Sequence, residues 1–203
     1  MRESPGLTLE RALWQKNIQP VGGMDEAGRG AWAGPVVAAL VILPEDEKIE
    51  SALEGVRDSK QMTPRQRARA ALKIKSAARA WSLGQASAAE IDSLGILPAT
   101  RLAFLRAVES CLLRPAYFLL DYLPWPDCPL PGARLVRGES QSLSIAAASV
   151  LAKTARDEIM LGLEGEYPGY GFARHKGYGT AFHRRALGIL GESLIHRRSF
   201  HWK

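Results

Sequence analysis

Two adjacent carboxylates, Asp25 and Glu26, come where a strand is expected to end, and glycines follow them. Residues 21–24 predict the strand. Gly28 and Gly30 predict a tight turn whose backbone N–H groups can approach a ligand closely, because glycine has no side chain in the way. Hard divalent cations such as Mg²⁺ take oxygen ligands, usually one or two carboxylates together with phosphate oxygens of the substrate. The pattern therefore favours metal-assisted chemistry on a phosphate or a sugar.

A dinucleotide site is the competing interpretation of this stretch, because residues 28–33 also match the loose pattern G-x-G-x-x-G/A. That pattern requires a helix directly after the glycines. Here Gly34 and Pro35 lead into the apolar run 36–43, which predicts a buried second strand. We therefore reject the dinucleotide site.

A further carboxylate, Asp121, ends the apolar run 116–120. Ligands bind at the carboxyl ends of parallel strands, so Asp121 would lie beside Asp25 if their two strands were neighbours. The alternative is an ordinary turn aspartate that opens the proline-rich loop 122–131, and this residue taken alone favours the turn.

The elements that must position these acids follow from hydrophobic periodicity and capping residues. Thr63 and Pro64 predict a helix start, and Ser142 or Ser144 predicts the start of an alanine-rich helix in which Lys153 and Asp157 form a surface ion pair. We expect strands over 21–24, 36–43, 81–86, 116–121 and 134–136, one more within or after the turn-rich patch 44–60, and helices over 9–14, 63–80, 88–92, 98–113 and from 142 or 144 onward.

Length and composition suit one medium-sized domain, or one domain with a small appendage, in a reducing compartment. The 203 residues are enough to bury a substantial core, and the two cysteines, Cys111 and Cys128, have neither a disulfide framework nor zinc spacing. The first residues lack the apolar core of a signal peptide, and no run is long enough to cross a bilayer. We expect a cytoplasmic protein without a membrane partner, and a monomer by default.

The net charge of +6 is concentrated in residues 174–203, which hold seven Lys or Arg and one acid, Glu192. A basic segment of this kind favours a polyanionic partner such as nucleic acid, although a solvated helix face would have the same composition. All four histidines also lie there, at spacings of 8, 13 and 5 residues that match no zinc pattern.

At this point the chain resembles ribonuclease HII over nearly its whole length, from about residue 21 to residue 200. Each motif alone is weak, but their order is specific. The motifs are Asp25-Glu26-Ala27-Gly28-Arg29-Gly30 with Gly34-Pro35-Val36, Asp58-Ser59-Lys60, Glu90-Ile91-Asp92, Leu120-Asp121, Ile145-Ala146-Ala147-Ala148-Ser149 with Ala152-Lys153 and Arg156-Asp157, Lys176-Gly177-Tyr178-Gly179-Thr180, and His196-Arg197.

The resemblance implies an α/β fold, a ribonuclease H-like mixed five-stranded sheet flanked by helices, with a C-terminal helical extension. It implies one catalytic domain over 1–203, of which 165–203 form the basic C-terminal part. The implied activity is endonucleolytic hydrolysis on the 5′ side of a ribonucleotide, in RNA/DNA hybrids or embedded in duplex DNA, leaving 3′-hydroxyl and 5′-phosphate ends. Such cleavage serves ribonucleotide removal in DNA replication and repair.

The resemblance also implies site residues. Four carboxylates would hold two divalent ions, Mg²⁺ or Mn²⁺, and by position they are Asp25, Glu26, Asp121 and Glu139. Two such ions can activate the attacking water and stabilise the leaving oxygen. The substrate would be read by backbone groups of Gly28, Arg29 and Gly30, by Tyr178, and by the loop Asp58-Ser59-Lys60. Only the 2′-hydroxyl distinguishes RNA from DNA at one position.

The sequence departs from the family pattern at two positions: Glu139 stands where Asp is usual, and Tyr122 follows Asp121 where Gly is usual. Because Glu is longer than Asp by one methylene, one alternative is a nucleic-acid-binding module of the same fold with weakened catalysis. A second alternative is a metal-independent ribonuclease that uses the tail histidines and attack by the 2′-hydroxyl.

Overall fold

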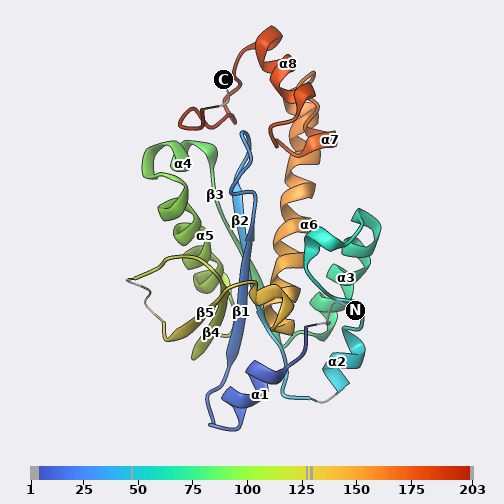
Figure 1. Cartoon of the computed structure of the whole chain (residues 1–203), viewed down its shortest axis with the longest axis vertical. Coiled ribbons are helices and arrows are strands. Elements are labelled where there is room, and N and C mark those ends of the chain that lie inside the picture. Colours follow the sequence, from blue (N-terminus) through green and yellow to red (C-terminus); the bar gives the residue numbers. More distant parts are fainter. Residues whose placement is uncertain (1–4, 47, 127, 129, 202–203) are drawn as a thin grey trace.

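A mixed five-stranded sheet forms the centre of the protein, which we describe from a computed structural model covering residues 5–201 except 47, 127 and 129 (Figure 1). The strand order is β3-β2-β1-β4-β5, and β2 pairs antiparallel with β1 and β3 while β4 pairs parallel with β1 and β5. The strands are β1 (Val21–Ala27), β2 (Val36–Ile42), β3 (Ala80–Ala86), β4 (Tyr117–Asp121) and β5 (Gly132–Leu135). The expected fold class is confirmed.

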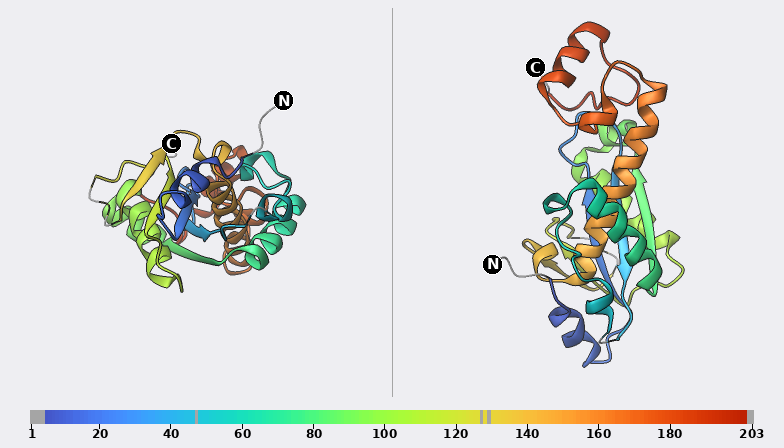
Figure 2. Two further views of the ribbon diagram at one scale, coloured as in Figure 1. Left: turned by 90° about the horizontal axis from the view of Figure 1, so that it is seen from below. Right: turned by 90° about the vertical axis from the view of Figure 1, so that its right-hand side faces the viewer.

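Helices cover both faces of the sheet (Figure 2). The long helix α6 packs on β1 and β2, with α3 outside it, while α5 covers β2 and β3 on the opposite face. The helices are α1 (Thr8–Trp14), α2 (Lys48–Ala52), α3 (Pro64–Ala77), α4 (Ala88–Leu94), α5 (Ile96–Ser110), α6 (Leu143–Glu166), α7 (Phe172–His175) and α8 (Ala181–Leu190), with 3₁₀ turns η1 (Ser59–Gln61) and η2 (Gly138–Ser140).

The first strand continues through both carboxylates instead of ending before them. Asp25 pairs with Ala39 and Glu26 with Ala38 of β2, so the sheet extends to Ala27. Pairing along a buried neighbour strand outweighs the low strand propensity of the two acids. Asp25 and Glu26 therefore point to opposite faces, and Asp25 shares the α6 face with Val21.

In its described residues, the turn-rich patch 44–60 does not contain the strand that was expected within or after it. Its described residues form α2 and η1 and contain no strand, and the third strand of the sheet is β3. The patch lacks the period-2 alternation that a half-buried strand needs.

Helix starts follow the predicted capping chemistry. Thr63 and Gln66 form a reciprocal capping box at α3, with Pro64 in the first turn. Ser142, not Ser144, caps α6 by accepting from the N–H of Ile145 at 3.1 Å. Both serine hydroxyls donate to the buried carboxylate of Glu10, which fixes α1 against the start of α6.

The C-terminal part follows α6 beyond the end of the sheet and returns toward it (Figures 1 and 2). It contains α7 and α8 and has a small core of its own around Phe172. Asp92 of α4 accepts from the N–H groups of Arg198 and Ser199, which ties the returning segment to the body. Within the described residues, no helix has both the length and the apolar character needed to cross a bilayer.

Candidate active site

Asp25 and Asp121 lie side by side because their strands are parallel neighbours. Met24 is in register with Leu120, so the two acids follow at the same level of the sheet. Each carboxylate is oriented by a backbone donor: the N–H of Glu26 donates to Asp25 Oδ1 and the N–H of Gly138 to Asp121 Oδ1, both at 2.8 Å. The juxtaposition predicted for these strand ends is confirmed.

Glu139 comes to the same region on the turn η2, directly before α6. The turn is held close to the sheet because Gly138 packs against Ile145 and Leu135, leaving no room for a Cβ without displacing them. Glu139 Oε2 is buried and has no hydrogen-bond partner among the described residues. A buried carboxylate oxygen without a partner is costly, so this atom is suited to accept a cation.

The electrostatics show that the four carboxylates act on one another. Burial and the charges of Glu26 and Asp121 raise the pKa of Asp25 well above its ordinary value, against a hydrogen bond with Ser149 that lowers it. Burial also raises the pKa of Glu26, although Arg29 opposes it with a 3.0 Å ion pair. Such clustering disfavours full ionisation without added positive charge.

The pKa of Glu139 is raised for the same reasons. Burial contributes most, and the charges of Asp121 and Asp58 add to it. In the described part of the chain, however, no three His, Cys, Asp or Glu side chains converge closely enough to enclose a metal ion as they lie.

The loop Asp58-Ser59-Lys60 borders the carboxylates. Asp58 caps η1 by accepting from the N–H of Lys60 at 2.9 Å, and Ser59 contacts the Ser149 hydroxyl at 2.9 Å. Burial alone would lower the pKa of Lys60, but Asp25, Asp58 and the neighbouring carboxylates raise it overall. Lys60 is thus a cation held in the field of the acidic cluster.

The turn formed by Gly28, Arg29 and Gly30 is fixed by two buried arginines. Arg197 donates to the carbonyl of Arg29 at 2.9 Å and twice to Gly34. Gly28 has φ +98°, and a Cβ at this position would collide with the guanidinium of Arg156. Glycine is required here by both the backbone conformation and the lack of space.

Tyr178 lies across from this turn in the loop between α7 and α8, as expected. Its ring packs on Arg156, with 5.3 Å from Cζ to the ring centroid, and on Lys153 at 5.5 Å from Nζ. Together these elements border a pocket of about 560 Å³, whose lining residues are Glu26, Ala27, Gly28, Arg29, Gly30, Ser59, Lys60, Ile96, Lys153, Tyr178 and Phe200. The structure thus brings the predicted carboxylates and the predicted substrate-contacting residues to one end of the sheet.

Some residues of this region were missed or underrated in the sequence. The predicted ion pair of Lys153 with Asp157 is present at 2.6 Å, but Lys153 also lines the pocket. Arg156 and Arg197 have completely buried side chains, although sequence patterns predict surface positions for arginine. No periodic signal in the sequence distinguishes them, since their partners are carbonyls of distant turns.

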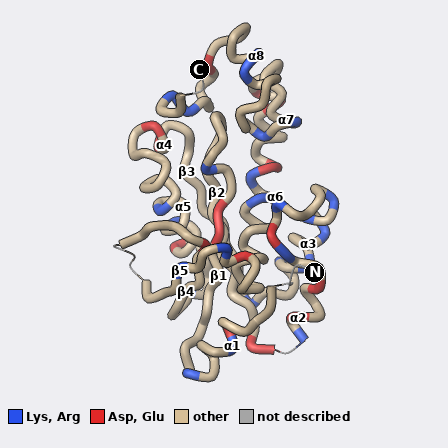
Figure 3. The backbone as a smooth tube through the Cα atoms, viewed as in Figure 1, with Lys and Arg blue, Asp and Glu red and all other residues tan. Residues whose placement is uncertain are grey.

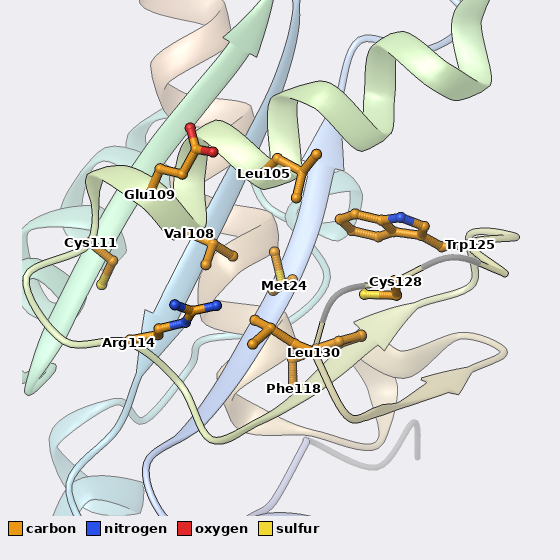
Figure 4. Close-up of a pocket in the computed structure, with 10 residues that line it drawn as sticks. All are labelled: Met24, Leu105, Val108, Glu109, Cys111, Arg114, Phe118, Trp125, Cys128 and Leu130. Atoms are coloured by element: carbon orange, nitrogen blue, oxygen red, sulfur yellow. The ribbon is translucent and has the colours of Figure 1, made fainter.

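A second pocket of about 510 Å³ lies on the opposite face of the sheet, between α5 and the loop after β4 (Figure 4). Met24, Leu105, Phe118 and Trp125 give it a mainly apolar lining, and none of its lining residues is a predicted site residue. It is therefore separate from the acidic cluster.

The tail histidines do not line the pocket beside the acids. His175, His183 and His196 are buried against one another and bonded to backbone groups. None of the three is available as a general base for attack by a 2′-hydroxyl, so that alternative loses three of its four histidines and keeps only the exposed His201.

Comparisons of the sequence and of the structure with known proteins agree on one protein family. Residues 22–203 match the family model described as Ribonuclease HII. A ribonuclease HII of Thermus thermophilus is 50% identical over 200 residues, which cover 98% of this chain and 93% of the relative. One of Dehalococcoides mccartyi is 47% identical over 196 residues, covering 97% and 92%. The solved ribonuclease H2 of Pyrococcus horikoshii superposes with a TM-score of 0.72 at 25% identity, covering 90% of this chain and 94% of that one.

Proposed function

Since this chain belongs to the ribonuclease HII family and is an endoribonuclease, we propose that it hydrolyses the phosphodiester on the 5′ side of a ribonucleotide, with Asp25, Glu26, Asp121 and Glu139 as its catalytic carboxylates. The observation that carries the assignment is the grouping of these four acids beside the pocket of Tyr178 and the Gly28–Gly30 turn. The substrates are RNA/DNA hybrids and duplex DNA with embedded ribonucleotides.

The four carboxylates fit a pair of divalent cations, Mg²⁺ or Mn²⁺, by the chemistry of their oxygens and by the unpartnered Oε2 of Glu139. When bound, such ions activate water and neutralise charge on the scissile phosphate and the leaving oxygen. Bound ions would favour the ionised carboxylates, because their positive charge offsets the burial and the repulsion that raise the pKa values of Asp25 and Glu139.

The reaction itself is an in-line displacement. Water forms a bond to phosphorus, and the bond from phosphorus to the 3′-oxygen of the preceding nucleotide breaks. That oxygen takes up a proton and leaves as a 3′-hydroxyl, while the ribonucleotide keeps a 5′-phosphate. Backbone groups of the Gly28–Gly30 turn and the ring of Tyr178 hold the ribonucleotide, and Lys60 and Arg29 contact phosphates.

The proposal is tested with an end-labelled DNA duplex that contains one ribonucleotide, incubated with Mg²⁺, Mn²⁺ or a chelator. The expected product is a metal-dependent cut 5′ to the ribonucleotide, with activity lowered at least about 100-fold in Asp25→Asn and Glu139→Gln, the order of magnitude lost with one essential transition-state contact. Glu54→Gln, which changes an exposed carboxylate in the turn after α2, is the matched control and should cleave like the wild type.

Full cleavage in chelator would overturn the metal-dependent mechanism. Wild-type activity in Glu139→Gln would remove Glu139 from the catalytic set, leaving the other three acids. Tight duplex binding without any cut would favour the alternative of a nucleic-acid-binding module with weakened catalysis. Membership of a family of nucleases argues against that alternative.

A further inference from the structure

Three buried histidines form a cluster beneath the loop that carries Tyr178. The rings of His175 and His183 stack with centroids 4.4 Å apart, and His183 lies 5.2 Å from His196. Phe172 packs edge-on against His183 at 5.5 Å between centroids. The reaction described above uses none of these imidazoles, although each is buried and hydrogen-bonded.

Hydrogen bonds assign the proton positions along two of these rings. The N–H of Ser193 donates to His196 Nδ1 at 2.8 Å, so the proton of His196 is on Nε2. His196 Nε2 lies 3.0 Å from His183 Nε2, which must accept, and His183 then carries its proton on Nδ1. That N–H donates to the backbone carbonyl of Tyr178 at 3.1 Å.

The third histidine holds the same loop from its other side. His175 Nδ1 accepts from the N–H of Gly177 at 3.2 Å, and its Nε2 donates to the carbonyl of Tyr170 at 2.8 Å. The N–H of Tyr178 donates to the carbonyl of His175 at 3.0 Å. The Tyr178 carbonyl also accepts from the N–H of Thr180 at 2.8 Å, so the His183 ring adds a second hydrogen bond to a carbonyl that the backbone already holds.

The surroundings favour uncharged imidazoles. Burial, together with the neighbouring rings of His175 and His196, lowers the pKa of His183 to about 4, although the bond to the Tyr178 carbonyl opposes this shift. Burial also lowers the pKa values of His175 and His196. The charged groups that face His175 are Glu164, Arg174 and Lys176, and Glu192 faces His196.

We propose that His183 and His196 are positioning residues for ribonucleotide recognition, acting through the directed chain Ser193–His196–His183–Tyr178. Each link has one proton, so a second proton between the two Nε2 atoms would set two donors against each other and break the link between His196 and His183. The inference rests on the proposed function, since it assumes that Tyr178 reads the substrate.

The proton arrangement is tested first, without reference to activity. Long-range ¹H–¹⁵N spectra of the wild-type protein at pH 7 distinguish the two neutral tautomers and the charged imidazole. The expected result is a neutral Nδ1–H tautomer for His183 and a neutral Nε2–H tautomer for His196. The opposite tautomer or a charged ring at either residue would overturn the chain.

The functional consequence is tested with a pair of variants at one position. The amide nitrogen of His183→Asn occupies nearly the place of Nδ1 and can still donate to Tyr178, whereas His183→Leu cannot. We expect KM for the single-ribonucleotide duplex to rise about tenfold in His183→Leu, in which the Tyr178 carbonyl keeps only the Thr180 N–H and loses one hydrogen bond, and to stay within about threefold in His183→Asn. Affinity for the all-deoxy duplex should be equal in both.

The outcomes separate this inference from the proposed function. A wild-type enzyme that does not cut at the ribonucleotide fails the proposed function before the variants are compared. An active wild type with equal KM changes in the Asn and Leu variants, at equal thermal stability, overturns the positioning role alone. Equal losses on ribonucleotide and all-deoxy duplexes would also overturn it, because they would mark a structural defect.

Discussion

Burial and like charge together set the properties of the site carboxylates Asp25 and Glu139. Asp25 is only 7% exposed and lies near Glu26 and Asp121, so its ionised form is disfavoured by both burial and like charge. Its backbone bond to Glu26 and its contact with Ser149 offset only part of this cost. Burial and like charge therefore cost stability at this cluster, and a bound cation would offset that cost.

Removing one of these charges should stabilise the metal-free protein. For Asp25→Asn in chelator we expect the free energy of unfolding to rise by about 0.5–2 kcal/mol, the usual range for relieving such local conflicts. Urea unfolding measures it. Glu54→Gln is the control with no expected change, and Mg²⁺ should stabilise the wild type more than the variant because the variant binds it more weakly. A lower stability of Asp25→Asn in chelator would contradict this account.

At the level of residues, the sequence indicated the site carboxylates better than the two buried arginines that hold the neighbouring turns. Asp25 and Asp121 were predictable because acids at the ends of apolar runs are unusual, whereas Glu139 depended on resemblance to a family. Arg156 and Arg197 were not predictable, since each satisfies carbonyls of turns more than 120 residues away. A local sequence pattern does not show which residues will be close in space when they are this far apart in the chain.

At the level of elements, most helices and strands followed from periodicity and capping residues. The exception in β1 is informative: strand pairing with β2 carries the backbone through Asp25 and Glu26 to Ala27. The parallel pairing of β1 with β4 places Asp121 beside Asp25. The sequence does not show which strands are neighbours, so it predicted this placement only on the condition that these two strands pair. The 3₁₀ turn η2, which carries Glu139, has three residues and is too short to show hydrophobic periodicity.

The packing of α7 and α8 through histidines gives this part of the molecule a pH dependence. An unfolded histidine takes up a proton near pH 6.5, while folded His183 does so near pH 4, so the unfolded state binds more protons between these values. Stability from this group is therefore complete above about pH 6.5 and is lost as the pH falls toward 4.

We expect the melting temperature of the wild type to fall between pH 7 and pH 5 by about 2–4 °C more than that of His183→Asn, which corresponds to about 1 kcal/mol in a chain of this size. The comparison of the two proteins removes the contribution of the carboxylates, whose raised pKa values act in the opposite direction. Scanning calorimetry at both pH values measures the difference. Identical pH dependence in the two proteins would show that His183 is already charged or exposed when folded.

At the scale of the whole molecule, charge is unevenly distributed (Figure 3). Residues 174–203 carry the entire net charge of +6, but the structure divides these cations into two groups. Arg197 is buried and bonded to carbonyls, whereas Arg184 and Arg185 of α8 are exposed. Only the exposed group is available to a polyanion.

The salt dependence of duplex binding should therefore depend on α8. In the double variant Arg184→Gln, Arg185→Gln we expect the slope of log affinity against log salt to decrease by about 1.8, since each lost phosphate contact removes about 0.9. Fluorescence anisotropy with an all-deoxy duplex measures the slope. Arg114→Gln, an exposed change beside the apolar pocket on the opposite face, should leave it unaltered. An unchanged slope in the double variant would place the duplex elsewhere.

The bond from Arg197 to the carbonyl of Arg29 joins residues that are 168 positions apart in the sequence. Because ribosomes make the chain from its N-terminus, Asp25, Asp121 and Glu139 are all synthesised before Arg197 exists to secure the Gly28–Gly30 turn. The Gly28–Gly30 turn can therefore reach its final form only after residue 197 has been synthesised and has left the ribosome.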